Sequence, residues 1–206
     1  AIDQKLSFNW LKTIHWVMQY PGFARLLYIC YYSMLIQLFF VFFWLGYVAL
    51  TYKVLYLQRL IICYILALFV VCAVSALWPA MAGYVFYDVQ DLANMNTAAA
   101  RIHEPDILAL RDGSMRTLPP LLQGLATFPS FHAVSAVLFM WAVWPFRQMR
   151  VLFILWNIMM LFSCLTHGGH YLIDVLGGVV IGLVSIKIIY RLVPLQPTER
   201  ELLAVT

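Results

Sequence analysis

The stretch LIICYILALFVVCAVSALWPAMAGYVFY, residues 60–87, contains no charged side chain and lies between Arg59 and Asp88. A helix that crosses a bilayer needs roughly 20 consecutive apolar residues. Lipid-exposed backbone must also satisfy its own hydrogen bonds, and a helix does so locally. We therefore predict a transmembrane helix from about Leu60 to Tyr87.

Four further intervals of the chain meet the same criterion. They run from about Leu26 to Tyr47, Phe131 to Pro145, Val151 to Leu165 and Tyr171 to Val193. Hydrophobic residues make up 64% of the 206 residues and charged residues 11%, which is far outside the range of soluble domains. The sequence therefore predicts an all-α integral membrane protein with a bundle of five transmembrane helices.

Charge and cysteine content exclude several classes of function. The formal net charge is +4, but the 13 Lys and Arg residues are scattered along the chain, which excludes a nucleic-acid partner. The four cysteines lie in apolar stretches without a CxxC pair: Cys30, Cys63, Cys72 and Cys164. We interpret them as small buried side chains rather than as disulfides or metal ligands.

An amphipathic helix precedes the first span. Apolar residues recur at helical spacing between residues 10 and 18, and Pro21-Gly22 ends the pattern. The apolar positions are Trp10, Leu11, Ile14, Val17 and Met18. We expect residues 1–25 to form an interfacial helix ahead of a membrane-embedded domain of residues 26–206. A membrane anchor is favoured over a lip that guides substrate.

A non-membrane loop at about residues 88–128 separates the second and third spans and holds most of the acidic residues. A loop of this length is usually functional or disordered. With five spans, this loop and the turn at residues 166–169 lie on one side of the membrane. Most Lys and Arg residues that flank the spans lie on the other side, which predicts that the loop side is non-cytoplasmic.

The segment Phe128-Pro129-Ser130-Phe131-His132 places a serine directly before an apolar helix. Serine is a good N-cap, and the free N–H groups of a helix N-terminus attract anions. Ser130 and these N–H groups are therefore candidates for binding phosphate, and His132 supplies a titratable proton. An ordinary capped helix with a snorkelling histidine is the alternative that this segment leaves open.

The segment THGGHYLID, residues 166–174, has two glycines that permit close backbone approach before a new helix. His170 and Asp174 are four residues apart and share a helix face. The carboxylate can accept a hydrogen bond from one imidazole nitrogen and leave the other as a nucleophile in a fixed tautomer. A histidine nucleophile suits phosphoryl transfer, because its phosphoramidate is reactive. The alternative for Asp174 is a first-turn acid that stabilises the helix dipole.

Both segments lie at span ends on the same side, which predicts a polar pocket at the membrane edge. His167 lines this pocket or caps the fourth span, and we assign it no role. Arg111 and Arg116 precede Ser130 and are candidates for clamping a phosphate with forked donors, with Arg101 more distant. A solvated side chain is the usual alternative for a loop arginine.

The motif residues resemble a known family. Residues 129–132 resemble the Pro-Ser-Gly-His motif of the type-2 phosphatidic acid phosphatase superfamily, and residues 163–174 fit its Ser-Arg-x5-His-x3-Asp spacing. Their form is most similar to the branch of inositol phosphorylceramide synthases and bacterial relatives. The resemblance covers about residues 60–193. The superfamily usually has six spans, which implies that the first lies upstream, is absent or is replaced by the amphipathic helix.

The resemblance implies a role for each matching residue. It implies that His170 attacks phosphorus, that Asp174 orients this imidazole, and that His132 protonates the leaving group. Ser130 and the amide of Phe131 are expected to hold phosphate oxygens.

Two positions depart from the family pattern. Cys164 stands where the third motif has an arginine, so one phosphate clamp is missing unless a loop arginine replaces it. The first motif, Lys-x6-Arg-Pro, is not present as such, and Arg111 and Arg116 are positional candidates only. These departures leave the histidine pair intact.

We therefore expect a lipid phosphate phosphatase or phosphotransferase that works through a phosphohistidine on His170, without a metal or another cofactor. Water as acceptor makes it a phosphatase and an alcohol makes it a transferase, and both stay open. One alternative is a haem-binding subunit that uses His132 with His167 or His170. Another is a catalytically inactive member that acts as a partner subunit. The absence of an HExxH helix argues against a zinc protease.

Overall fold

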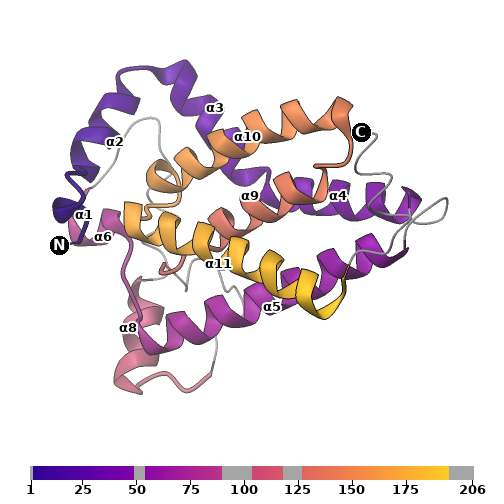
Figure 1. Ribbon diagram of the computed structural model, residues 1–206. Coiled ribbons are helices and arrows are strands. Elements are labelled where there is room, and N and C mark those ends of the chain that lie inside the picture. Colours follow the sequence, from indigo (N-terminus) through magenta and orange to yellow (C-terminus); the bar gives the residue numbers. More distant parts are fainter. Residues whose placement is uncertain (1, 49–53, 90–103, 118–126, 195–206) are drawn as a thin grey trace.

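The computed structural model describes residues 2–48, 54–89, 104–117 and 127–194 (Figure 1). Within these ranges the chain forms helices joined by turns, and no β-strand. The helices are α1 (Ile2–Lys5), α2 (Trp10–Met18), α3 (Pro21–Tyr32), α4 (Met34–Val48), α5 (Val54–Leu77), α6 (Gly83–Phe86), α8 (Glu104–Asp112), α9 (Phe131–Ala142), α10 (Arg147–Thr166) and α11 (Leu172–Leu192). The predicted class, an all-α integral membrane protein, is confirmed.

The short helix α9 lies at the centre of the bundle. It packs against α4, α5, α10 and α11, and its residues 133–139 are all buried. Its 12 residues span about 18 Å at 1.5 Å per residue, less than the hydrocarbon core of a bilayer. The helix predicted from Phe131 to Pro145 therefore ends early, at Ala142. Because neighbouring helices cover α9, its ends need not reach both membrane surfaces.

Within the described residues, three helices are long and apolar enough to cross a membrane: α5, α10 and α11. The last two match the predicted fourth and fifth spans to within a few residues. The second span was predicted to reach Tyr87, but α5 ends at Leu77. Pro79 follows two residues later and cannot continue the hydrogen-bond ladder, so the chain turns before the short helix α6.

The first predicted span consists of two helices. α3 and α4 meet at Ser33 with a bend of 49°, and together they form a fourth candidate span. The Ser33 hydroxyl donates to the carbonyl of Cys30 at 2.7 Å, and it accepts from the side chains of Gln37 and Trp156 at 3.1 and 2.9 Å. A serine that bonds back to the preceding turn favours a bend in the helix. The expectation of one unbroken helix from Leu26 to Tyr47 is corrected by this break.

The N-terminal amphipathic helix is α2, which lies beside α3 and α10. Its apolar face forms a buried cluster with α3 and α6: Trp10, Ile14, Val17, Ala24, Leu27 and Tyr84. The face that we expected to anchor the helix in the membrane is therefore covered by protein. The expected boundary at residue 25 falls inside α3, so α2 and α3 are parts of one packed unit.

Candidate active site

Ser130 caps the N-terminus of α9, as the sequence predicts. Its Oγ accepts a hydrogen bond from the amide of Ala133 at 3.4 Å, and its amide donates to the carbonyl of Asp174 at 3.0 Å. A Cβ at Gly178 would overlap the Ser130 carbonyl, so the glycine lets α9 and α11 approach closely. The two motif segments are therefore in direct contact.

The first amides of α9 remain available next to Ser130. The first four N–H groups of an α-helix have no acceptor within the helix. Ser130 accepts from the third and fourth of these, those of Ala133 and Val134. The amides of Phe131 and His132 have no acceptor among the residues that the structure describes. Together with the helix dipole, these two donors have the arrangement that binds an anion.

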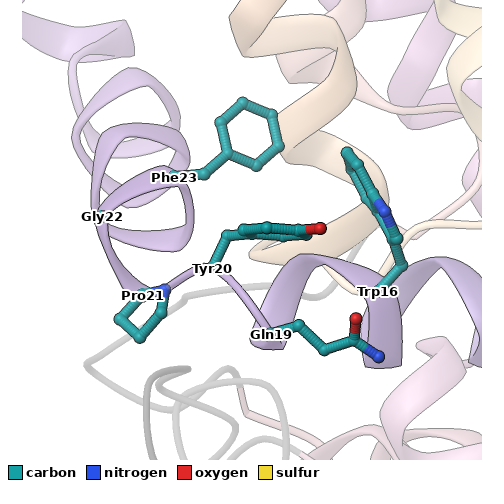
Figure 2. Close-up of a pocket in the computed structure, with 6 residues that line it drawn as sticks. All are labelled: Trp16, Gln19, Tyr20, Pro21, Gly22 and Phe23. Atoms are coloured by element: carbon teal, nitrogen blue, oxygen red, sulfur yellow. The ribbon is translucent and has the colours of Figure 1, made fainter.

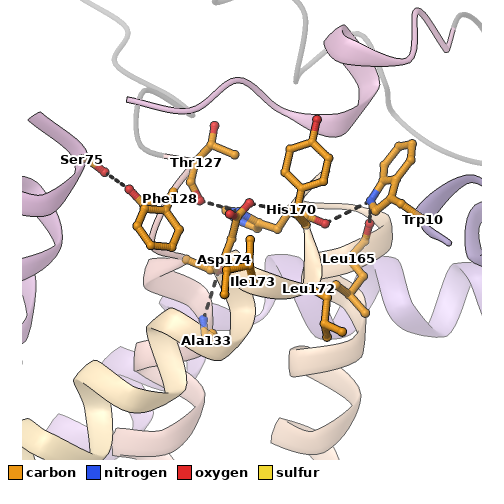
Figure 3. A network of polar contacts seen from close by, with 12 residues as sticks. Trp10, Ser75, Thr127, Phe128, Ala133, Leu165, His170, Leu172, Ile173 and Asp174 are labelled. Carbon is orange, nitrogen blue, oxygen red and sulfur yellow. Dashed lines mark hydrogen bonds and ion pairs between the residues drawn. The ribbon is translucent and has the colours of Figure 1, made fainter. Parts of the chain in front are cut away.

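The imidazole of His170 is held by a backbone carbonyl (Figure 3). Its Nδ1 lies 2.8 Å from the carbonyl oxygen of Thr127, at hydrogen-bond distance. A carbonyl only accepts, so Nδ1 carries the proton and Nε2 is left with its lone pair. The residue is 5% exposed, so packing also holds this orientation. The fixed tautomer that a histidine nucleophile needs is therefore present.

Asp174 contributes charge rather than the predicted hydrogen bond. One of its carboxylate oxygens lies 3.7 Å from Nδ1 of His170, beyond hydrogen-bond range. The same oxygen accepts from the amide of Tyr171 at 2.9 Å and so closes the capping box of α11. The expected acceptor of the His170 proton is thus replaced by Thr127, because that carbonyl is closer. The capping box shows Asp174 as a first-turn acid, and its role as partner of the histidine stays a prediction.

Residues far away in sequence hold the loop between α10 and α11. The indole N–H of Trp10 donates to the carbonyls of Leu165 and His170 at 2.9 and 3.0 Å (Figure 3). The hydroxyl of Tyr84 donates to the carbonyl of Thr166, and Trp10 packs against the Tyr84 ring. The helices α2 and α6 therefore support the backbone on which His170 stands.

Two glycines let this loop pass between the surrounding rings. Gly169 has a positive φ of 62° and lies against Tyr84, where a Cβ would approach the ring to 2.7 Å. A Cβ at Gly168 would lie 2.6 Å from the His170 ring and 2.8 Å from that of Tyr31. Any larger residue at either position would displace His170 or its supports.

Asp3 caps the N-terminus of α11 from the opposite end of the chain. Its carboxylate accepts from the amides of Leu172 and Ile173 at 2.9 and 3.2 Å, and the residue is 5% exposed. The carboxylate also complements the helix dipole. Sequence reasoning missed Asp3, Trp10 and Thr127, since no local pattern marks any of them as a partner of the third motif.

His132 is the second residue of α9. Its ring stacks on the ring of Tyr31, with centroids 4.0 Å apart and an interplanar angle of 11°. His132 is also close enough to His170 for the two imidazoles to interact electrostatically. The structure thus brings together the two histidines, Ser130 and Asp174, as the sequence predicts.

The family model of the PAP2 superfamily, the type-2 phosphatidic acid phosphatases, matches residues 1–188. The chain belongs to the PAP2 superfamily. Comparisons with curated proteins and with solved structures find no match. The family supports, at a general level, a membrane enzyme of the phosphatase or phosphotransferase kind that acts on lipid phosphates. The match includes α1 and α2, in agreement with their contacts to the motif loop.

In this PAP2 chain a neutral thiol faces the capping serine. Cys164 is fully buried and lies close enough to Ser130 for the two side chains to interact electrostatically. Its thiol also lies 3.2 Å from the carbonyl of Met160, and its own carbonyl accepts from the amide of His170 at 3.1 Å. The position at which the motif has arginine therefore lies near Ser130, and here it carries a thiol in place of a guanidinium.

The two candidate clamp arginines of this PAP2 chain lie apart from the histidines. Arg111 is on α8 and Arg116 follows it, and both side chains are exposed. No described contact joins either of them to Ser130 or His170. Arg101 lies outside the described residues. In the described part of the chain, no three His, Cys, Asp or Glu side chains are grouped to hold a metal ion.

An open groove lies between α2 and α3, away from this pocket (Figure 2). Aromatic side chains project into it from both helices, and it is lined by Trp16, Gln19, Tyr20, Pro21, Gly22 and Phe23. None of these residues contacts the histidines or Ser130 in the structure. The groove is therefore a feature of the N-terminal helices and is separate from the PAP2 motifs.

Proposed function

We propose that this protein is a metal-independent lipid phosphate phosphatase or phosphotransferase with a phosphohistidine intermediate on His170. The observation that carries the proposal is the hydrogen bond from Nδ1 of His170 to Thr127 at 2.8 Å. It leaves the lone pair of Nε2 as the nucleophile and keeps the ring in place for an in-line attack. The charge of Asp174, 3.7 Å from Nδ1, stabilises the positive charge that develops on the ring.

In the first step, Nε2 of His170 forms a bond to phosphorus while the bond from phosphorus to the lipid oxygen breaks. His132 gives its proton to that departing oxygen. In the second step, a hydroxyl oxygen forms a bond to phosphorus, the N–P bond breaks, and the hydroxyl proton passes to His132. Both histidines then return to their starting states. Water in the second step yields inorganic phosphate, and an alcohol yields a new phosphate ester.

The phosphoryl oxygens are bound by neutral donors in this proposal. The amides of Phe131 and His132 and the hydroxyl of Ser130 surround the N-terminus of α9, where the helix dipole favours negative charge. Because Arg111 and Arg116 are exposed and apart from the pocket, we leave them out of the resting site. The predicted non-cytoplasmic position of the pocket follows from the charges that flank the spans.

An inactive PAP2 member that serves as a partner subunit is the second candidate. Cys164 favours it, because a thiol replaces the charge that would otherwise neutralise the phosphate. Turnover distinguishes the two candidates directly. An active enzyme releases or transfers phosphate, whereas an inactive subunit does neither on any lipid phosphate.

The test is phosphate release from a panel of lipid phosphates in detergent with a metal chelator present. Wild type is compared with His170→Ala, His132→Ala and the exposed control His15→Ala. We expect chelator-resistant turnover that vanadate inhibits, that both site variants lose and that His15→Ala keeps. Turnover that survives in His170→Ala would contradict the proposal. A Soret band in the purified protein would support the haem hypothesis instead.

A further inference from the structure

Tyr31, near the end of α3, touches both motif segments and has no role in the mechanism above. Its ring stacks on that of His132, with centroids 4.0 Å apart and an interplanar angle of 11°. On the other segment, a Cβ at Gly168 would lie 2.8 Å from Cε2 of Tyr31 and 2.6 Å from the ring of His170. The tyrosine ring therefore packs against the helix that carries one histidine and against the loop that carries the other.

The two histidines are held by different kinds of contact. Nδ1 of His170 donates to the carbonyl of Thr127 at 2.8 Å. Neither ring nitrogen of His132 is hydrogen-bonded to a residue that the structure describes, and the residue is half-buried. A histidine side chain turns about two bonds, and the second of these has only a broad preference of its own. The stack with Tyr31 is therefore the contact that sets the plane of the His132 ring, and it leaves both nitrogens for substrate.

The stack also suits a histidine that gives up a proton. The face of an aromatic ring carries partial negative charge and attracts a cation within about 6 Å of its centroid. His132 must be protonated for the first proposed step, and an imidazolium lies over the Tyr31 ring at 4.0 Å. Two neutral rings gain less from a nearly parallel stack than from an edge-to-face contact. The geometry thus favours the protonated form of His132.

Hydrogen bonds at the break between α3 and α4 hold Tyr31 in place. Ser33, two residues further on, accepts from the indole N–H of Trp156 on α10 at 2.9 Å. The side chain of Gln37 accepts from that of Asn157, also on α10, at 2.9 Å. Buried hydrogen bonds of this kind are costly to break where no water can replace them. They fix the end of α3 against α10 and so fix the position of the Tyr31 ring.

We propose that Tyr31 is a positioning residue for His132. Its ring holds the imidazole in the orientation from which a proton passes to the departing lipid oxygen and returns from the attacking hydroxyl. This inference rests on the proposed function, because it assumes that His132 makes these two proton transfers. No bond forms to Tyr31, and its hydroxyl takes no part, so a phenylalanine ring at this position serves equally well.

The first test compares variants of Tyr31 on a lipid phosphate. Tyr31→Leu removes the ring, and we expect kcat to fall about tenfold with little change in KM, because a misaligned acid slows only the chemical step. Tyr31→Phe keeps the ring and should stay within about twofold of wild type. Tyr28→Leu is the matched control, since Tyr28 lies one turn earlier on α3 and contacts His167 instead of His132. Tyr31→Met fills the space without a ring and replaces Tyr31→Leu if that variant does not fold.

The second test asks whether Tyr31 acts through the proton donor. The leaving group of p-nitrophenyl phosphate departs without a proton, so its release in the first turnover does not need His132. We expect Tyr31→Leu to release p-nitrophenolate in the first turnover at a rate within about twofold of wild type. An equal loss of rate on both substrates would overturn the inference, because Tyr31 would then act on the nucleophile or on the fold. A folded Tyr31→Leu protein with the kcat of wild type on lipid phosphate would also overturn it.

NMR of the protein with ¹³C-labelled histidine measures the orientation without turnover. In wild type and in Tyr31→Phe, the stacked ring should shift the ring protons of His132 upfield and keep this imidazole ordered. In Tyr31→Leu the shift should vanish and the order parameter of the ring should fall, while the ring of His170, held by Thr127, stays as ordered as in wild type. An equally ordered His132 ring in Tyr31→Leu would contradict the inference. A protein that is inert toward every phosphate ester but shows this loss of order loses the proposed function alone.

Discussion

Cys164 lies near Ser130, at the position where the third PAP2 motif has an arginine. A guanidinium at this position offers forked, charged donors to phosphate oxygens, whereas a thiol offers one weak donor. In the proposed site, backbone amides and the helix dipole therefore bind the anion in place of a guanidinium.

Replacing the thiol with a guanidinium should strengthen anion binding. For Cys164→Arg we expect the inhibition constant of vanadate to fall about tenfold, because a charge-assisted hydrogen bond replaces a neutral one. The same change should lower the melting temperature in detergent, since a cation is buried. Cys164→Ser, which keeps a small donor, is the control and should leave vanadate inhibition unchanged. Weaker inhibition of a folded Cys164→Arg protein would show that this position does not face the anion.

The hydrogen bond from His170 to Thr127 makes a prediction for Asp174. Asp174→Asn removes the charge but not the acceptor of the His170 proton, so the tautomer is kept. We expect kcat to fall about 100-fold, short of the complete loss in His170→Ala. The kcat values of the two variants on one lipid phosphate make the comparison. Equal and complete loss in both would mean that Asp174, and not Thr127, fixes the imidazole.

At the scale of helices, α1 and α2 act as supports for the start of α11. Asp3 caps α11, and Trp10 donates to two carbonyls of the preceding loop. Both side chains are buried, at 5% and 1% exposure. The N-terminal helices thus support the backbone that carries His170, the proposed nucleophile, and their removal should displace it.

The substitution Asp3→Ala tests whether α1 stabilises the N-terminus of α11. Asp3→Ala should lower the free energy of unfolding by about 1 kcal/mol, as expected for the loss of a helix N-cap. Thermal unfolding in detergent at fixed protein concentration measures the change. Asp106→Ala on α8, where no described partner holds the carboxylate, should leave the melting temperature in place. An Asp3→Ala protein with the melting temperature of wild type would show that Asp3 does not stabilise α11.

The substitution Trp10→Phe tests whether α2 stabilises the loop that carries His170. Trp10→Phe leaves the carbonyls of Leu165 and His170 without their buried partner, which should cost about 1–3 kcal/mol of stability. Because the loop carries His170, we also expect kcat to fall more than KM rises. Trp16→Phe, which changes an exposed indole on the same helix, is the matched control. A Trp10→Phe protein that is destabilised but keeps its kcat would show that Trp10 contributes to stability and does not position His170.

Across the whole molecule, the sequence predicts local features such as helices, and it does not predict contacts between residues that are far apart in the chain. The charge-free runs predicted α10 and α11 closely, because the length of an apolar run is a local property. The spacing of His170 and Asp174 predicted their proximity, but it did not show that Thr127 is the closer acceptor. Trp10 and His170, which are in contact, are 160 residues apart in the sequence, and no periodic pattern predicts a contact at that separation.

The proposed mechanism requires that Nε2 of His170 carry the phosphoryl group between donor and acceptor. The most direct measurement is rapid quenching of wild type during turnover of a ³²P-labelled lipid phosphate, followed by mapping of the labelled residue. We predict an acid-labile, base-stable label on His170 that is absent in His170→Ala and accumulates in His132→Ala if that variant slows the second step more than the first. Turnover without any trapped label on His170, or a label on another residue, would contradict the account.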